Sequence, residues 1–251
     1  MKPYILVTND DGVNAPGILT LIKQMMKLGD VLVVAPDVPR SGQSSAVTVN
    51  NPIHAQLIEK KLGLTRYSCN GTPADCVKLA IDDLAERKPD LVVSGVNHGS
   101  NASVNVIYSG TMGATLEGCL HGVPSIGFSL SDHSMQADFS YLEPILSKIA
   151  EKTLHHGLPE KVCLNVNAPI GPIKGVQIVR QCRGQWTREF EKRTNPHGKD
   201  YYWLTGFFEN FEPTAKDTDE WVLANGYVSV VPVSIDMTAH KAMEELKKWN
   251  L

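Results

Sequence analysis

The sequence predicts an α/β protein built on a mostly parallel sheet with helices on both faces. Apolar β-branched runs alternate with segments of helical period through about the first half of the chain. The runs are apolar throughout rather than alternating, which is typical of strands covered on both faces. At 251 residues the chain can bury a full core. We expect a single domain over 1–251, with a core of about 1–170 and an irregular extension of about 171–251.

Four apolar runs in the first half predict buried strands of this sheet. A segment of helical period follows the first run, after Pro16-Gly17, and its apolar residues recur on one face. A loop crowded with Gly and Asn follows the third run, and the next helix is expected to start near Thr111. The predicted strands cover 4–7, 31–35, 91–94 and 125–129.

Thr72 predicts a helix start in detail. It is followed by Pro73 and, three residues after Thr72, by Asp75. A Thr cap, a Pro in the first turn and an acid at the third position together are typical of a capped helix N-terminus.

The pattern changes past about residue 130. Region 169–219 is irregular, aromatic and rich in turn residues, and its short runs 177–179 and 201–204 predict antiparallel ribbon. The aromatic side chains of the ribbons and of the terminal helix fit subunit contacts or local packing over the sheet: Trp186, Trp203, Phe207, Phe208 and Trp249. Regular elements are expected at 141–155 (helix), 162–166 (strand), 226–232 (strand) and 237–249 (helix).

Composition excludes several classes of protein. Lys and Arg number 24 against 27 Asp and Glu, a formal charge of -3, so the basic excess of a nucleic-acid-coating protein is missing. Five cysteines form no C-x-x-C pair and are odd in number, which indicates reduced thiols. No apolar run reaches about 18 residues, and the first strand leaves no room for a signal peptide. We expect a cytoplasmic protein without a nucleic-acid polymer or a membrane as partner.

Asp10 and Asp11 follow the first strand directly, within Asn9-Asp10-Asp11-Gly12. Two ionised carboxylates about 4 Å apart repel by about 4 kcal/mol at an effective dielectric near 20. Folding that brings them together therefore needs a cation, a proton or solvent. A hard divalent cation, Mg²⁺ or Mn²⁺, suits carboxylate oxygens. The alternative is an Asp-Gly turn whose acids face water.

Polar residues follow other predicted strands too. Ser41 comes after the second strand, and Asn97 and Asn101 follow the strand 91–94. Ligands of open α/β sheets bind outside the carboxyl ends of the strands. Two carboxylates, a hydroxyl and an amide carbonyl would give Mg²⁺ a partial octahedron with positions left for water and substrate. Each Asn could instead serve a turn, and His98 is expected to be an exposed loop residue.

Ser109-Gly110-Thr111 leads from a loop into a predicted helix. Free backbone N–H groups and the dipole at a helix N-terminus attract anions, the two hydroxyls add donors, and Gly110 permits close approach. The segment therefore predicts a phosphate site, although Ser-Gly-Thr before a helix also occurs as a cap alone.

Two other classes share parts of this pattern. A response-regulator receiver also places paired acids after its first strand, but it is shorter and needs a phosphoacceptor Asp where this chain has Asn97. A dinucleotide-dependent oxidoreductase needs G-x-G-x-x-G in the first turn, where this chain has acids.

The ordered motifs resemble the SurE survival-protein family over nearly the whole chain. They are VTNDDG at 7–12, VAPD at 34–37 with RSG at 40–42, NGTPADCV at 70–77, SGVNHGSN at 94–101, VIYSGT at 106–111, GYVS at 226–229 and DMTAH at 236–240. The resemblance implies a Rossmann-like core with a C-terminal hairpin and helix extension that holds dimers or tetramers together.

The resemblance also implies a metal-dependent nucleotidase. Members hydrolyse nucleoside 5'- and 3'-monophosphates, some also short polyphosphate. By position, the ligands of one divalent ion per subunit correspond to Asp10, Asp11, Ser41 and Asn97. The resemblance also implies that the two acids are catalytic. The phosphate-binding positions fall on Asn97, Asn101, Ser109, Gly110 and Thr111. Residues 101–105 depart from the pattern of relatives, so base preference is not carried over.

Overall fold

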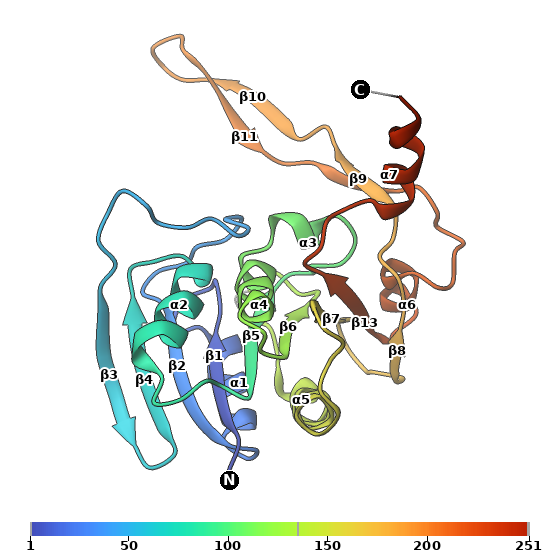
Figure 1. Cartoon of the computed structure of the whole chain (residues 1–251). Coiled ribbons are helices and arrows are strands. Elements are labelled where there is room, and N and C mark those ends of the chain that lie inside the picture. Colours follow the sequence, from blue (N-terminus) through green and yellow to red (C-terminus); the bar gives the residue numbers. More distant parts are fainter. Residues whose placement is uncertain (1, 135, 250–251) are drawn as a thin grey trace.

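The computed structural model describes residues 2–134 and 136–249, and a nine-stranded sheet runs through the centre of this part (Figure 1). The strand order is β3-β4-β2-β1-β5-β6-β7-β13-β8. Neighbours are parallel except for β3 with β4 and β13 with β7, so the expected mostly parallel sheet is confirmed. The strands are β1 (Tyr4–Thr8), β2 (Asp30–Pro36), β3 (Ala55–Lys61), β4 (Leu64–Cys69), β5 (Leu91–His98), β6 (Ser125–Leu130), β7 (Val162–Ala168), β8 (Val176–Ile178) and β13 (Val228–Ser234).

Helices cover both faces of this sheet. On one face α1 (Pro16–Met25) packs against α5 (Glu143–His156), which follows the 3₁₀ turn η2 (Ser140–Leu142). On the other face α2 (Pro73–Leu79) packs against α4 (Gly110–Leu120), and the π-helical turn η1 (Ala80–Leu84) continues α2. The two apolar clusters between sheet and helices form the core. Among the described residues, no helix has the length and apolar character needed to cross a membrane.

Thr72 begins α2 as predicted. Its side chain accepts from the backbone N–H of Asp75, and the Asp75 carboxylate accepts from the N–H of Thr72 at 2.9 Å, so both halves of the capping box are present. Two orphan N–H donors of the first turn are thereby satisfied.

The C-terminal part contributes an extension as well as sheet strands. Strands β10 (Phe190–Thr194) and β11 (Asp200–Leu204) form an antiparallel hairpin that projects from the body (Figure 1). At its base β9 (Gly184–Thr187) pairs antiparallel with β12 (Phe207–Asn210). The short helices α6 (Asp219–Ala224) and α7 (His240–Leu246) and the turn η3 (Lys247–Trp249) complete this part.

The prediction that 177–179 belongs to an antiparallel ribbon is wrong. Strand β8 instead adds to the edge of the main sheet, parallel to β13. The other edge of β13 is taken by β7, and the long connection from β8 through α6 allows β8 and β13 to run in the same direction. Strands β3 and β4 were not predicted, because β3 is a largely exposed edge strand without an apolar run.

The chain order reverses between β1 and β5. From β1 the sheet continues to β2 and β4 on one side, whereas β5, β6 and β7 follow on the other. A crevice therefore forms outside the carboxyl ends of β1 and β5, the place where open α/β sheets bind ligands. Asp10 and Asn97 come from these two strand ends.

Candidate active site

A cavity of about 470 Å³ opens at this switch point. Loops that follow β1, β2 and β5 contribute to it, together with α6 and the β9–β12 pair. Five of the residues predicted for the site line the cavity: Asp10, Ser41, Asn97, Asn101 and Ser109. The structure thus brings together segments that lie far apart in the sequence.

Asp10 is buried, with only 3% of its surface exposed. Its Oδ1 accepts a 2.5 Å hydrogen bond from the Thr111 hydroxyl, and its carbonyl accepts from the N–H of Arg40 at 2.7 Å. Burial raises the pKa of Asp10 to about 6, the bond from Thr111 lowers it, and the charge of Asp11 raises it further. A cation placed beside this carboxylate would favour its ionised form.

The start of α4 packs directly against Asp10. A Cβ added at Gly110 would lie 2.9 Å from the Cβ of Asp10, so a larger residue would force the helix away from the acid. Ser109 caps the helix by accepting from the N–H of Met112 at 3.0 Å. Its hydroxyl proton stays free to donate toward the cavity. Thr111 is fully buried, and its hydroxyl is directed to Asp10 rather than to the cavity.

Asp11 is held by His98. Its Oδ2 accepts from the His98 backbone N–H at 3.2 Å and lies 3.2 Å from His98 Nδ1. The imidazole also packs edge-on against Phe139, with ring centroids 4.9 Å apart. His98 is thus half-buried and positions Asp11, whereas the sequence predicted an exposed loop residue.

Asn97 lines the cavity with its side-chain amide nitrogen engaged by its own loop. The amide nitrogen donates to the carbonyl of Gly99 at 2.8 Å, so Oδ1 remains available as a ligand. Ser41 lies exposed at the cavity rim after β2. Both offer oxygen, as do the two acids, and such a donor set fits Mg²⁺ or Mn²⁺. Among the described residues no group of three His, Cys, Asp or Glu side chains could hold an ion, so such a site depends on Ser41 and Asn97.

Asn101 belongs to a hydrogen-bonded network over the ends of β6 and β7. Its side-chain nitrogen donates to Ser129 and its backbone N–H to Asn167, while Asn165 donates to its carbonyl. These bonds, 2.7 to 2.8 Å long, fix the loop after β5 across two neighbouring strands. Asn101 therefore shapes the cavity through both its side chain and its backbone.

Further residues line the cavity that sequence reasoning did not assign to it. They are Asn105, His133, Trp186, Phe208 and Glu220. Trp186 and Phe208 are paired across the β9–β12 ladder, and their rings pack edge to face with centroids 6.1 Å apart. Two adjacent Phe residues in a strand point to opposite faces, which is a sequence signal for one inward-facing ring, and the structure leaves Phe208 half-buried and Phe207 exposed. The sequence around Glu220 contains no motif that would assign it to a site.

The lining contains no Lys or Arg side chain among the described residues. Its acidic residues are Asp10 and Glu220. A dianionic ligand could then be neutralised only by helix N–H groups, imidazoles or an added cation. The charge distribution thus favours a metal ion wherever a phosphate binds.

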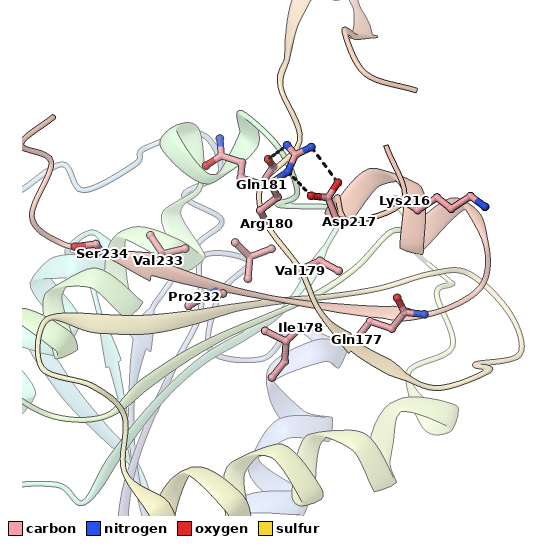
Figure 2. Close-up of a pocket in the computed structure, with 11 residues that line it drawn as sticks. Gln177, Ile178, Val179, Arg180, Gln181, Lys216, Asp217, Pro232, Val233 and Ser234 are labelled. Atoms are coloured by element: carbon pink, nitrogen blue, oxygen red, sulfur yellow. Dashed lines mark hydrogen bonds and ion pairs between the residues drawn. The ribbon is translucent and has the colours of Figure 1, made fainter. Parts of the chain in front are cut away.

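A second cavity, of about 740 Å³, lies at edge strand β8 and offers no comparable chemistry. Figure 2 shows the Arg180 guanidinium there bonded to Asp217, and Glu212 accepts a second set of bonds from it. These carboxylates keep the Arg180 pKa above its usual range. The ammonium of Lys216, the other cation of this lining, lies 6.0 Å from the Trp221 ring centroid.

The chain matches proteins of one family along its length. The family model described as "Survival protein SurE" matches residues 5–188. Two proteins named "5'-nucleotidase SurE", from Flavobacterium psychrophilum and Phocaeicola vulgatus, are 54% and 51% identical to it, over 100% of this chain and 98% of each relative. The crystal structure of a SurE protein from Aquifex aeolicus superposes with a TM-score of 0.84 at 37% identity, over 99% of this chain and 100% of that one. The chain therefore belongs to the SurE survival-protein family.

Proposed function

We propose that this chain is a 5'-nucleotidase, a phosphomonoesterase that hydrolyses nucleoside 5'-monophosphates to nucleoside and phosphate and needs a divalent cation. Full-length similarity to proteins named 5'-nucleotidase supports the reaction. One observation supports the cation most directly. Buried Asp10 lines the same cavity as Asn97 and Ser41, and the described lining of this cavity contains no Lys or Arg. A phosphate monoester needs positive charge there.

Asp10, Asp11, Ser41 and Asn97 would hold the ion, Mg²⁺ or Mn²⁺. When bound, such an ion makes a coordinated water more acidic and neutralises charge on the phosphoryl group. Thr111 orients the Asp10 carboxylate for this task, and His98 orients that of Asp11. The four donors come from three strand ends, so folding itself assembles the site.

Ser109 and the first N–H groups of α4 would bind the phosphoryl oxygens, with Gly110 and Thr111 contributing backbone donors. Asn101 would border the same oxygens. In the hydrolysis, water forms the new P–O bond in line with the nucleoside oxygen, which leaves and takes up a proton. The proton of the attacking water passes to one of the two acids, Asp10 or Asp11.

The family resemblance extends the proposal. Nucleoside 3'-monophosphates and short polyphosphate are proposed as further substrates, and a homodimer or homotetramer as the assembled form. Exposed apolar side chains on the hairpin and at its base support an assembly: Phe190, Tyr201, Tyr202, Trp203 and Leu204 on the hairpin, and Phe207 in β12. A cytoplasmic location fits the five cysteines, which form no disulfide. The division at about residue 170 into core and extension stays a prediction.

Phosphate release from a panel of nucleoside 5'- and 3'-monophosphates tests the proposal. The purified chain should release phosphate with Mg²⁺ or Mn²⁺ present, lose the activity in EDTA and regain it when the metal is restored. Full activity in EDTA would contradict the cation requirement, and no release from any 5'-monophosphate would contradict the reaction.

A further inference from the structure

Glu220 is the one acidic residue of the described cavity lining besides Asp10. It has no part in the proposed metal site, phosphate site or hydrolysis. It lies half-buried on α6. Among the described residues, no hydrogen bond or ion pair involves its carboxylate. Burial raises the pKa of Glu220 to about 7, and the neighbouring charge of Asp219 also acts to raise it. The carboxylate oxygens of Glu220 are therefore available to accept hydrogen bonds from a ligand in the cavity.

The place of Glu220 is fixed by the residue before it. Asp219 is fully buried, and its carboxylate accepts from the backbone N–H groups of Ser103 and Cys182, each at 2.8 Å. The start of α6 is thereby tied to the loop after β5 and to the segment that leads into β9. Asp219 thus fixes the start of α6, and the next residue, Glu220, lines the cavity.

The same loop joins the phosphate end of the cavity to the aromatic pair. Asn105 accepts from the Trp186 indole N–H at 2.7 Å, and Asn101 is tied to Asn167 on β7. Helix α6 packs on β7 and β13, and β7 lies two strands from β5. The cavity therefore extends from the end of β5 to α6, over two strand spacings or about 10 Å.

We propose that Glu220 binds the ribose hydroxyls of the nucleotide, beside an aromatic surface made by Trp186 and Phe208 that packs against the base. This inference rests on the proposed nucleotidase function. A carboxylate offers two acceptor oxygens, and the 2'- and 3'-hydroxyls of ribose offer two neighbouring donors. Every ribonucleoside 5'-monophosphate carries this pair of donors. An aromatic face accepts any base, because every base has a π-face.

Steady-state kinetics with matched substrates test the proposal: adenosine 5'-monophosphate, its 2',3'-dideoxy analogue and p-nitrophenyl phosphate. The wild type should show a KM about tenfold lower for the ribonucleotide than for the dideoxy analogue. Glu220→Ala should remove this difference by raising the ribonucleotide KM about tenfold, and it should leave the other two substrates within about twofold. Glu220→Gln, which keeps the size of the side chain, should give a smaller increase.

Glu151→Ala, the same change at an exposed position of α5, is the control and should change none of these values. An equal KM increase for the dideoxy analogue in Glu220→Ala would assign Glu220 a packing role and overturn the proposal. An increase confined to guanosine 5'-monophosphate would assign it to the base and overturn it as well. Absence of phosphate release by the wild type from every nucleotide would instead overturn the proposed function, and this inference with it.

Discussion

The Thr111 hydroxyl donates a 2.5 Å hydrogen bond to Oδ1 of Asp10, across 101 positions of the sequence. The bond links the first turn of α4 to the loop after β1, so the helix that would bind phosphate also orients the acid that would bind the metal. The bond also lowers the pKa of Asp10 against the larger effect of burial.

Thr111→Val should lower kcat roughly tenfold to a hundredfold, because a hydrogen bond to a charged group is lost while the shape of the side chain is kept. Since the bond lowers the pKa of Asp10, its loss should also move the acid limb of the pH–rate profile to higher pH. Thr111→Ser, which keeps the hydroxyl, is the control and should retain the wild-type profile. Equal profiles for all three proteins would contradict this role.

Asp10→Asn should stabilise the metal-free protein at neutral pH. The folded pKa of Asp10 is about 6, above its ordinary value of 3.8, so folding favours the protonated acid. The contribution of Asp10 to the free energy of unfolding is fully present below about pH 4 and is lost as the pH rises through about 6. This contribution amounts to roughly 3 kcal/mol. Denaturant unfolding in EDTA should show the variant more stable than wild type at pH 7.5, with the gap closing toward pH 4.

The same variant should lose most of its activity and no longer gain stability from Mn²⁺. A wild-type kcat in Asp10→Asn would remove the proposed catalytic role, whatever its stability.

Ser109→Ala should raise KM for phosphate esters several-fold and cost about 1 kcal/mol of stability through loss of the α4 cap. Thr72→Ala is a matched control, since Thr72 caps α2 away from the cavity. It should cost similar stability in denaturant unfolding without changing KM. If both variants changed KM alike, the effect would come from destabilisation rather than from a phosphate contact.

Trp203→Glu in the hairpin should lower the mass measured by light scattering after size exclusion, because a charge at an apolar contact opposes assembly. Trp203 is 58% exposed in the single chain. Leu62→Glu, at a fully exposed position between β3 and β4, is the control and should leave the mass unchanged. An unchanged mass for Trp203→Glu would place the subunit contact elsewhere.

The parallel core could be predicted because its strands are buried on both faces. Val31 to Ala35 and Leu91 to Val93 are wholly apolar, so their sequence alone indicates a covered sheet. Edge strands carry no such signal: β3 is largely exposed, and β8 has three residues. The direction of β8 depends on which edge of β13 is open, a property of the assembled sheet.

That Asp10, Ser41 and Asn97 line one cavity could be predicted, because ligand-binding residues of open α/β sheets gather at strand ends and because several motifs resemble one family. Residues that reach the cavity from the C-terminal part could not. Glu220 lies on a helix whose first residue, Asp219, bonds to Ser103 and Cys182, contacts that span 116 and 37 positions. His98 was assigned to an exposed loop because its partner Asp11 lies 87 positions away.

A crystal soaked in Mn²⁺ and measured at the manganese absorption edge tests the central claim most directly. We expect one anomalous peak per chain, within bonding distance of Asp10 and Asn97 at the carboxyl ends of β1 and β5. An active crystal form with no peak at that position, or with its only peak elsewhere, would contradict the claim.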